Sequence, residues 1–290
     1  MVETLQLDTA AGRFQALAAG PADGPLTLVL HGFPDAPPTF ELLLRELAGR
    51  GLRAVAPWMR GYAPSPLAGP YDVETLAGDV VALCDILAPD GDRVHLLGHD
   101  WGAAVTYAAA ALAPARFGPS LALAVPHPLA FLRAAATSAQ AVRSWYMAFF
   151  QVPGAERVAA ARDFALLERL WRTWSPGYAL PAALRAEVWR CLRASWPAPL
   201  LYYRAMFRPV AEARRRLSPS SGIARRLTVP LLYLHGADDG CIAPSAARGA
   251  ERYFVGAYRA EVIAGAGHFL AAECPDEIAG RAAAWIHGAG

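Results

Sequence analysis

The stretch that decides the fold is residues 93–103, which read RVHLLGHDWGA. Its apolar start, residues 94–97, is typical of a buried strand, and the alanine-rich run that follows it through Ala113 is typical of a helix. Between them, the glycines of Gly98-His99-Asp100-Trp101-Gly102 permit a cramped backbone. The stretch therefore predicts a strand, a tight turn and a helix, with Asp100 raised above the edge of a sheet.

This layout is that of a nucleophile elbow, in which the residue between the two glycines is usually a serine, as in G-x-S-x-G. In this chain the position is taken by Asp100. A serine attacks acyl carbons, whereas a carboxylate attacks a saturated carbon and leaves an alkyl ester on the enzyme. The sequence therefore indicates a nucleophilic carboxylate.

Short apolar runs outside the elbow predict the rest of the sheet. Runs that read as strands occupy residues 26–30, 52–56, 121–125, 229–235 and 258–263, and residues 2–19 read as two edge strands. Helical spacing marks residues 42–47, 73–87 and 275–286. Strands that alternate with helices at this rhythm indicate the α/β class, with a mostly parallel central sheet and helices on both faces.

The alternation stops in the middle of the chain. Residues 130–215 are helical and aromatic, have no strand-like run and are divided by prolines at 153, 176, 181, 197 and 199. We expect this segment to be a helical cap (lid) inserted into a core domain that is formed by residues 1–129 and 216–290.

Composition excludes several classes of function. The chain has 290 residues, of which 55% are hydrophobic, and a net charge of only +2, so a nucleic-acid partner is not indicated. Four cysteines without C-x-x-C spacing, Cys84, Cys191, Cys241 and Cys274, favour buried free thiols over a metal site. The N-terminal residues lack a signal-peptide pattern, and no apolar run suits a membrane span, so we expect a cytoplasmic enzyme.

A carboxylate nucleophile needs a base to activate the water that cleaves its ester. His268 follows the last predicted strand, where the chain order of nucleophile, acid and histidine places the base. The orienting acid is expected after the preceding strand, in residues 234–240 (LHGADDG), where Asp238 and Asp239 are both candidates. His31 and His99 also adjoin the predicted site, and we expect them to hydrogen-bond its loops.

Donors for an oxyanion are expected from two backbone N–H groups. Trp101, the residue after the nucleophile, supplies one. Phe33, in the His31–Asp35 loop (HGFPD) that follows the third strand, supplies the other, and its bond to Pro34 is a candidate for the cis geometry. Two tyrosines of the cap segment, Tyr146 and Tyr203, are phenol donors, although composition alone favours a packing role for them.

Together these motifs resemble the epoxide hydrolases of the α/β-hydrolase fold, soluble and of bacterial type. They occur in family order and span nearly the whole chain. The matching segments are HGFPD at 31–35, MRGY at 59–62 with Ser65, GHDWG at 98–102, Trp145-Tyr146 followed by FQVPG at 150–154, Tyr203-Arg204, and GHFL at 267–270 followed by Glu273.

The resemblance implies that Asp100 is the nucleophile and that His268 and Asp239 activate water, since the family's G-x-x-D spacing favours Asp239 over Asp238. It implies that Tyr146 and Tyr203 bind the epoxide oxygen. Further substrate contacts are assigned to Trp101, Phe33, Phe150 and Tyr202. The family needs no metal and no organic cofactor; its partners are an epoxide and water, and a homodimer is left open.

Aromatic side chains in the cap segment suggest an apolar tunnel and hence lipophilic epoxides as substrates of the expected hydrolase, which would yield vicinal diols. The first alternative is a haloalkane dehalogenase, which would use the same Asp100 and could bind halide at Trp101. Phe33 argues against it, because halide release needs a second polar donor at that position. A binding protein without catalysis is the other alternative, although every part of the constellation is present.

Cys241 departs from the family pattern and has no functional account.

Overall fold

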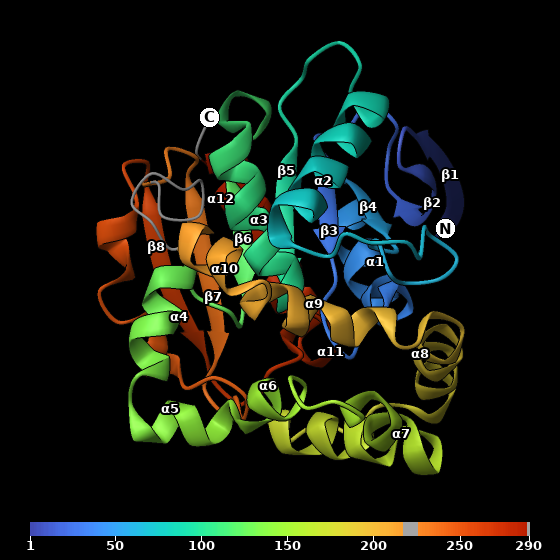
Figure 1. The fold of residues 1–290 in the computed structure, drawn as a ribbon. Coiled ribbons are helices and arrows are strands. Elements are labelled where there is room, and N and C mark those ends of the chain that lie inside the picture. Colours follow the sequence, from blue (N-terminus) through green and yellow to red (C-terminus); the bar gives the residue numbers. More distant parts are fainter. Residues whose placement is uncertain (217–225, 289–290) are drawn as a thin grey trace.

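A single eight-stranded sheet organises the molecule in a computed structural model that describes residues 1–216 and 226–288 (Figure 1). Its strand order is β1-β2-β4-β3-β5-β6-β7-β8. The strands are β1 (Glu3–Thr9), β2 (Gly12–Ala19), β3 (Leu26–Leu30), β4 (Arg53–Pro57), β5 (His95–His99), β6 (Ser120–Leu123), β7 (Leu231–Gly236) and β8 (Tyr258–Ile263). Only the pairs β1–β2 and β2–β4 are antiparallel, so the mostly parallel sheet predicted from the apolar runs is confirmed.

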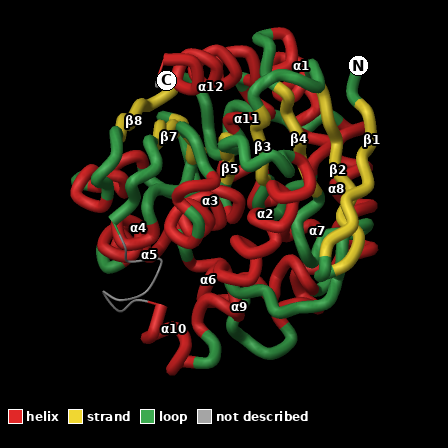
Figure 2. Tube along the Cα trace, turned by 90° about the horizontal axis from the view of Figure 1, so that it is seen from above, coloured by secondary structure: helices red, strands yellow, loops and turns green. Residues whose placement is uncertain are grey.

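Helices cover both faces of this sheet, as Figure 2 shows from above. One face is packed by α1 (Glu41–Gly49), α11 (Leu270–Glu273) and α12 (Pro275–Gly288), whose leucine, isoleucine and alanine side chains join Val29, Leu97 and Leu121 in one core cluster. On the other face, α2 (Val73–Leu87) and α3 (Trp101–Leu112) bury their apolar sides with Leu28, Leu96 and Ala122. The alternation of strand side chains between these two cores explains why the strands read as continuous apolar runs.

Three details of the sheet differ from the sequence prediction. β1 is an edge strand, but β2 lies between β1 and β4. β6 ends at Leu123, two residues earlier than predicted, because Ala124 adopts a left-handed φ of 66° that no strand can continue. β4 ends on Pro57 itself rather than before it.

Seven helices connect β6 to β7 within the described residues: α4 (Pro128–Ala135), α5 (Ser138–Arg143), α6 (Trp145–Phe149), α7 (Ala155–Trp174), α8 (Ala182–Ser195), α9 (Ala198–Phe207) and α10 (Val210–Arg216). In Figure 1, α5, α6, α7 and α8 form a layer below the sheet. α7 is bent, since residues 161–164 have non-helical backbone angles. Of the segment 216–290 that the sequence assigned to the core domain, residues 217–225 and 289–290 lie outside the described residues.

Four short 3-10 helices complete the described part of the chain: η1 (Pro37–Phe40), η2 (Pro114–Arg116), η3 (Pro244–Ala247) and η4 (Ala250–Tyr253). None of the helices described has the length and apolar character that crossing a membrane requires. The loops that follow β3, β5 and β7 meet at one edge of the sheet, as expected for parallel strands, and there they carry His31–Asp35, Asp100 and Asp239.

Candidate active site

Asp100 lies in a sharp turn between β5 and α3, with a left-handed φ of 53° and a ψ of −115°. The turn is compact enough to require glycine on both sides. A Cβ on Gly98 would lie 2.1 Å from the carbonyl oxygen of Gly102, and one on Gly102 would lie 2.1 Å from that of Leu30. An unfavourable backbone of this kind persists only where the surrounding structure imposes it, and such positions concentrate at functional sites.

A backbone donor binds the carboxylate of Asp100, and a second predicted donor adjoins it. The N–H of Phe33, in the loop after β3, donates to Oδ1 of Asp100 across 2.7 Å. The Phe33–Pro34 bond of this loop is cis, as the sequence suggested. Trp101 is the first residue of α3, and the first N–H groups of a helix have no intrahelical acceptor. The two residues predicted to donate to an oxyanion therefore both adjoin Asp100.

His268 lies between two carboxylates. Its Nδ1 is 2.9 Å from Oδ2 of Asp239, and its Nε2 is 3.6 Å from Oδ2 of Asp100. The imidazole is fully buried. Burial alone lowers the pKa of His268, but the negative charges of Asp239 and Asp100 outweigh it and raise that pKa to about 10. The arrangement brings the predicted nucleophile, base and acid into one row.

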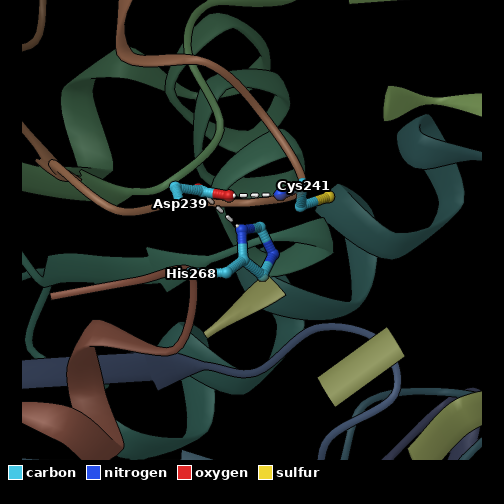
Figure 3. A group of neighbouring side chains, drawn as sticks. All are labelled: Asp239, Cys241 and His268. Carbon is cyan, nitrogen blue, oxygen red and sulfur yellow. Dashed lines mark hydrogen bonds and ion pairs between the residues drawn. The ribbon is translucent and has the colours of Figure 1, made fainter. Parts of the chain in front are cut away.

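Asp239 is the aspartate of the LHGADDG loop that faces His268, while Asp238 is exposed to solvent. Figure 3 shows the Asp239 carboxylate between the imidazole and the backbone of Cys241. Its Oδ1 accepts from the N–H groups of Cys241 and Ile242 at 2.7 and 2.9 Å. Burial raises the pKa of Asp239, but the adjacent imidazolium and these donors prevail and lower it. Asp239 is thus held ionised.

Asp239, Cys241 and His268 also form a group whose possible ligand atoms lie within 4.8 Å of one another. The donor chemistry fits a metal poorly. Both oxygens of Asp239 accept hydrogen bonds, and burial raises the pKa of the Cys241 thiol well above its usual value, whereas a metal binds the thiolate. In Figure 3 the sulfur points away from the carboxylate, and it lies 3.3 Å from the hydroxyl of Tyr146. The group is better suited to hydrogen bonding.

The two predicted phenols come from different helices. Tyr146 lies in α6 and Tyr203 in α9, and their rings meet edge to face with centroids 5.7 Å apart. Both are buried, and burial raises the pKa of each phenol well above its usual value, so both keep their protons. Within the described chain, the buried hydroxyl of Tyr203 has no hydrogen-bond partner. Since buried polar groups are almost always paired, this hydroxyl is available to a ligand.

A cavity of about 180 Å³ joins the phenols to the carboxylate. Asp100, Tyr146 and Tyr203 line it, together with Trp101 and Tyr202. The other lining residues are mostly apolar: Tyr71, Val73, Ala104, Val125, Pro128, Phe131, Leu132, Met147, Ala205, Met206, Phe207 and Ile242. The cavity therefore presents an apolar surface around a few polar atoms, which is the usual character of a small-molecule site.

A family model described as alpha/beta hydrolase fold matches residues 25–274. The chain belongs to the alpha/beta hydrolase fold family. The fold predicted from the sequence is therefore confirmed both by the sheet and by the family match.

Individual relatives of this alpha/beta hydrolase are named as epoxide hydrolases. Epoxide hydrolase A of Mycobacterium tuberculosis is 28% identical over 312 residues, which cover 94% of this chain and 93% of the relative. A solved epoxide hydrolase of Bacillus megaterium, in complex with an inhibitor, has a TM-score of 0.83 at 24% identity over 98% of this chain and 100% of its own. A mutant epoxide hydrolase of Solanum tuberosum has a TM-score of 0.80 at 25% identity and covers 99% of this chain and 100% of its own.

Four residues were assigned to substrate contacts in this hydrolase, and the structure separates them. Trp101 and Tyr202 line the cavity, with the hydroxyl of Tyr202 donating to the carbonyl of Arg60. Phe33 and Phe150 are not among the lining residues. Instead their rings pack against that of Tyr203, with centroids 5.2 and 5.1 Å away, so they hold the phenol ring in position.

The sequence did not single out the apolar residues of α4 and α9 that line the cavity, since nothing in their type distinguishes them from core residues. His31 and His99 bind loops, as expected. Nε2 of His31 accepts from the N–H of Met59 at 3.1 Å, and Nε2 of His99 lies 2.9 Å from the carbonyl of His268. Burial lowers the pKa of both His31 and His99 to about 4, so this hydrolase keeps them neutral.

Proposed function

We propose that the protein is an epoxide hydrolase that converts lipophilic epoxides to vicinal diols through a covalent ester at Asp100. One observation carries the proposal: a carboxylate and two protonated phenols line one apolar cavity. A carboxylate can attack an epoxide carbon, and phenols can hold and protonate the oxygen that leaves it. The names of the relatives, among them Epoxide hydrolase A, support the same activity.

In the first step, Oδ2 of Asp100 forms a bond to one oxirane carbon while the bond from that carbon to the epoxide oxygen breaks. Tyr146 and Tyr203 donate hydrogen bonds to the epoxide oxygen, and one phenol passes its proton to the developing alkoxide. Oδ1 of Asp100, which accepts from the N–H of Phe33, keeps the carboxylate oriented for attack. The product of this step is a hydroxyalkyl ester.

Ester formation changes the state of His268. Two carboxylates raise the pKa of its imidazole in the free enzyme, and esterification removes the charge of one of them. The pKa of His268 therefore falls once Asp100 is alkylated, and its imidazolium gives its proton to the phenolate left by the first step. The neutral Nε2 can then accept a proton from water. Asp239, bound to Nδ1, fixes the tautomer and stabilises the imidazolium that forms.

In the second step, this water attacks the carbonyl carbon of the Asp100 ester. The N–H groups of Phe33 and Trp101 stabilise the tetrahedral oxyanion. Collapse of this intermediate breaks the bond between the ester oxygen and the carbonyl carbon, and the imidazolium of His268 protonates the departing diol. The proton that remains on the Asp100 carboxyl returns to His268, so that the sum of both steps is epoxide plus water to diol.

We further assign residues 130–215 to a cap over this site and residues 1–129 and 216–290 to the catalytic core. Tyr146 and Tyr203 both belong to the cap segment, whereas Asp100, Asp239 and His268 belong to the core. The proposed division thus separates the groups that bind the epoxide oxygen from those that form and cleave the ester. Because the cavity is apolar apart from Asp100 and the phenols, we assign uncharged, lipophilic epoxides as substrates.

A haloalkane dehalogenase would use the same nucleophile, but two features of the site disfavour it. Phe33 offers only its backbone N–H, which is bonded to Asp100, and its ring packs against Phe150 and Tyr203. Displacement of halide also gives the two phenols no alkoxide to protonate.

The test is intact-protein mass spectrometry of His268→Gln after incubation with styrene oxide and, separately, with 1-bromobutane. Without its base the enzyme should stop at the ester, so styrene oxide should add one equivalent of mass on the Asp100 peptide. An adduct from the bromide alone would make the protein a dehalogenase, and no adduct from either would contradict the proposal. Asp100→Asn in the same background is the control that should remain unmodified.

A further inference from the structure

The C-terminal turn of α7 contacts several loops of the proposed active site. The ring of Trp171 stacks on that of Phe269 with centroids 3.4 Å apart, and its indole N–H donates to the carbonyl of Pro34 at 2.9 Å. The ring of Trp174 lies edge-on to His268 with centroids 5.1 Å apart. One turn of a helix in the segment between β6 and β7 therefore touches both the base and the loop that carries an oxyanion donor.

Two side chains, the buried Ser175 and the half-buried Glu273, bind the backbone on both sides of His268. The Ser175 hydroxyl accepts from the N–H of Phe269 at 3.0 Å and donates to Oε1 of Glu273 at 2.6 Å. The other oxygen of Glu273 accepts from the N–H of Gly267 at 2.7 Å. Ser175 is fully buried. The residues before and after the base are thus tied to a single hydrogen-bonded pair.

The carbonyl oxygen of Trp174 completes this arrangement. It accepts from the N–H of His268 at 3.1 Å and from the N–H of Gly240 at 3.0 Å. Gly240 directly follows Asp239, the carboxylate that binds the imidazole. The end of α7 therefore fixes the loops of the acid and of the base relative to each other through one shared acceptor.

Two glycines allow the loops to approach α7 this closely. A Cβ on Gly267 would lie 2.6 Å from Cα of Ser175, and a Cβ on Gly240 would lie 1.9 Å from the carbonyl oxygen of Thr173. Neither position has room for a side chain. The contact is therefore between backbones, which transmits small displacements better than a contact between flexible side chains.

We propose that Ser175, acting with Glu273, is a positioning residue that aligns His268 for hydrolysis of the ester and has no part in forming it. This inference rests on the proposed function. Alkylation uses Asp100, Tyr146 and Tyr203, and Ser175 and Glu273 hydrogen-bond to the loop of His268 instead. A base that must accept a proton from water bound to the ester is sensitive to displacement by less than an ångström.

The test compares the two half-reactions of Ser175→Ala and Glu273→Gln with those of the wild type, using styrene oxide in single-turnover and steady-state experiments. Ester hydrolysis should slow by between about tenfold and a hundredfold in each variant, while the alkylation rate stays unchanged. The enzyme should then accumulate as the ester, and kcat and KM should fall together while kcat/KM and its pH profile are preserved. The double variant should be no slower than the slower single variant, because both changes break the same pair.

Thr173→Ala is the matched control. This residue lies two positions before Ser175 and is exposed, and among the described residues its hydroxyl bonds only to carbonyls of its own helix, so both half-reactions should be those of the wild type. Should Ser175→Ala fail to fold, Glu273→Gln, which keeps the side-chain shape, gives the same comparison.

Three outcomes overturn the positioning role: unchanged ester hydrolysis in both variants, an equal loss in kcat and kcat/KM, or an equal effect in Thr173→Ala. These outcomes are distinct from failure of the proposed function. If neither the wild type nor His268→Gln ever forms an ester with an epoxide, the proposed function is contradicted. If the ester forms and both variants hydrolyse it normally, only the role of Ser175 and Glu273 is lost.

Discussion

The imidazole of His268 stands between two carboxylates, with Asp239 2.9 Å from Nδ1 and Asp100 3.6 Å from Nε2. The contact with Asp239 is a hydrogen bond. The contact with Asp100 is longer than a hydrogen bond, so Nε2 is free to bind water. In the proposed reaction Asp100 becomes an ester and loses its negative charge, whereas Asp239 keeps its charge. The charge state of His268 is therefore coupled to the state of Asp100.

Asp100→Asn should lower the pKa of His268 from about 10. The reason is electrostatic: a nearby negative charge favours the imidazolium, and asparagine removes that charge in nearly the same shape, as the ester does. Nitrogen NMR of labelled histidine, followed over a pH titration, measures the shift. Asp238→Asn, which removes a solvent-exposed charge, serves as the control. An unchanged pKa of His268 in Asp100→Asn would show that the charge of Asp100 does not act on the imidazole.

Asp239→Asn should slow ester hydrolysis by a factor on the order of 10⁴, since the amide can no longer hold the imidazole in the tautomer that accepts a proton at Nε2. Alkylation by Asp100 should persist, and the ester should accumulate. Rapid-quench mass spectrometry follows both steps. The neighbouring Asp238→Asn variant should behave as the wild type, and the reverse result would assign the acid to Asp238.

Tyr146→Phe and Tyr203→Phe should each slow alkylation, by about 10²-fold, because each removes one donor to the epoxide oxygen. The double variant should nearly abolish the step. Tyr202→Phe is a matched control, since its ring lines the same cavity but its hydroxyl is bound to Arg60. Stopped-flow measurement of ester formation tests all four proteins, and an unaffected double variant would remove the phenols from the mechanism.

Gly102→Ala should destabilise the fold by about 1–3 kcal/mol, because its Cβ would lie 2.1 Å from the carbonyl of Leu30. Gly49→Ala, at the exposed end of α1, meets no atom within 4 Å and should be neutral or stabilising by up to about 1 kcal/mol. Urea denaturation of both variants provides the comparison. Equal stabilities would show that the turn at Asp100 relaxes more easily than its contacts indicate.

The parts of the site that could be predicted from sequence are those whose geometry is local. The glycines around Asp100 specify a turn through short-range contacts, and the order of strands places the loops of Phe33, Asp239 and His268 at one edge of the sheet. Sequence alone left Asp238 and Asp239 open, because only packing decides which of two adjacent carboxylates is buried.

Contacts between distant segments could not be predicted. Phe131 of α4 and Met206 of α9 line the same cavity because the fold brings both helices to it, and no local pattern separates these residues from core residues. Ser175 is a single serine at the end of a helix, 94 residues from Phe269, whose N–H it binds. Its place beside the base depends on the path of the whole segment between β6 and β7.

The central claim is that Asp100 forms an ester that water cleaves at the enzyme carbonyl. Single-turnover reaction with styrene oxide in heavy-oxygen water, followed by mass spectrometry of the Asp100 peptide, tests it most directly. Heavy oxygen should enter the Asp100 carboxylate and be absent from the diol of the first turnover. Heavy oxygen found only in the diol would mean that water attacks the epoxide itself and that Asp100 forms no ester.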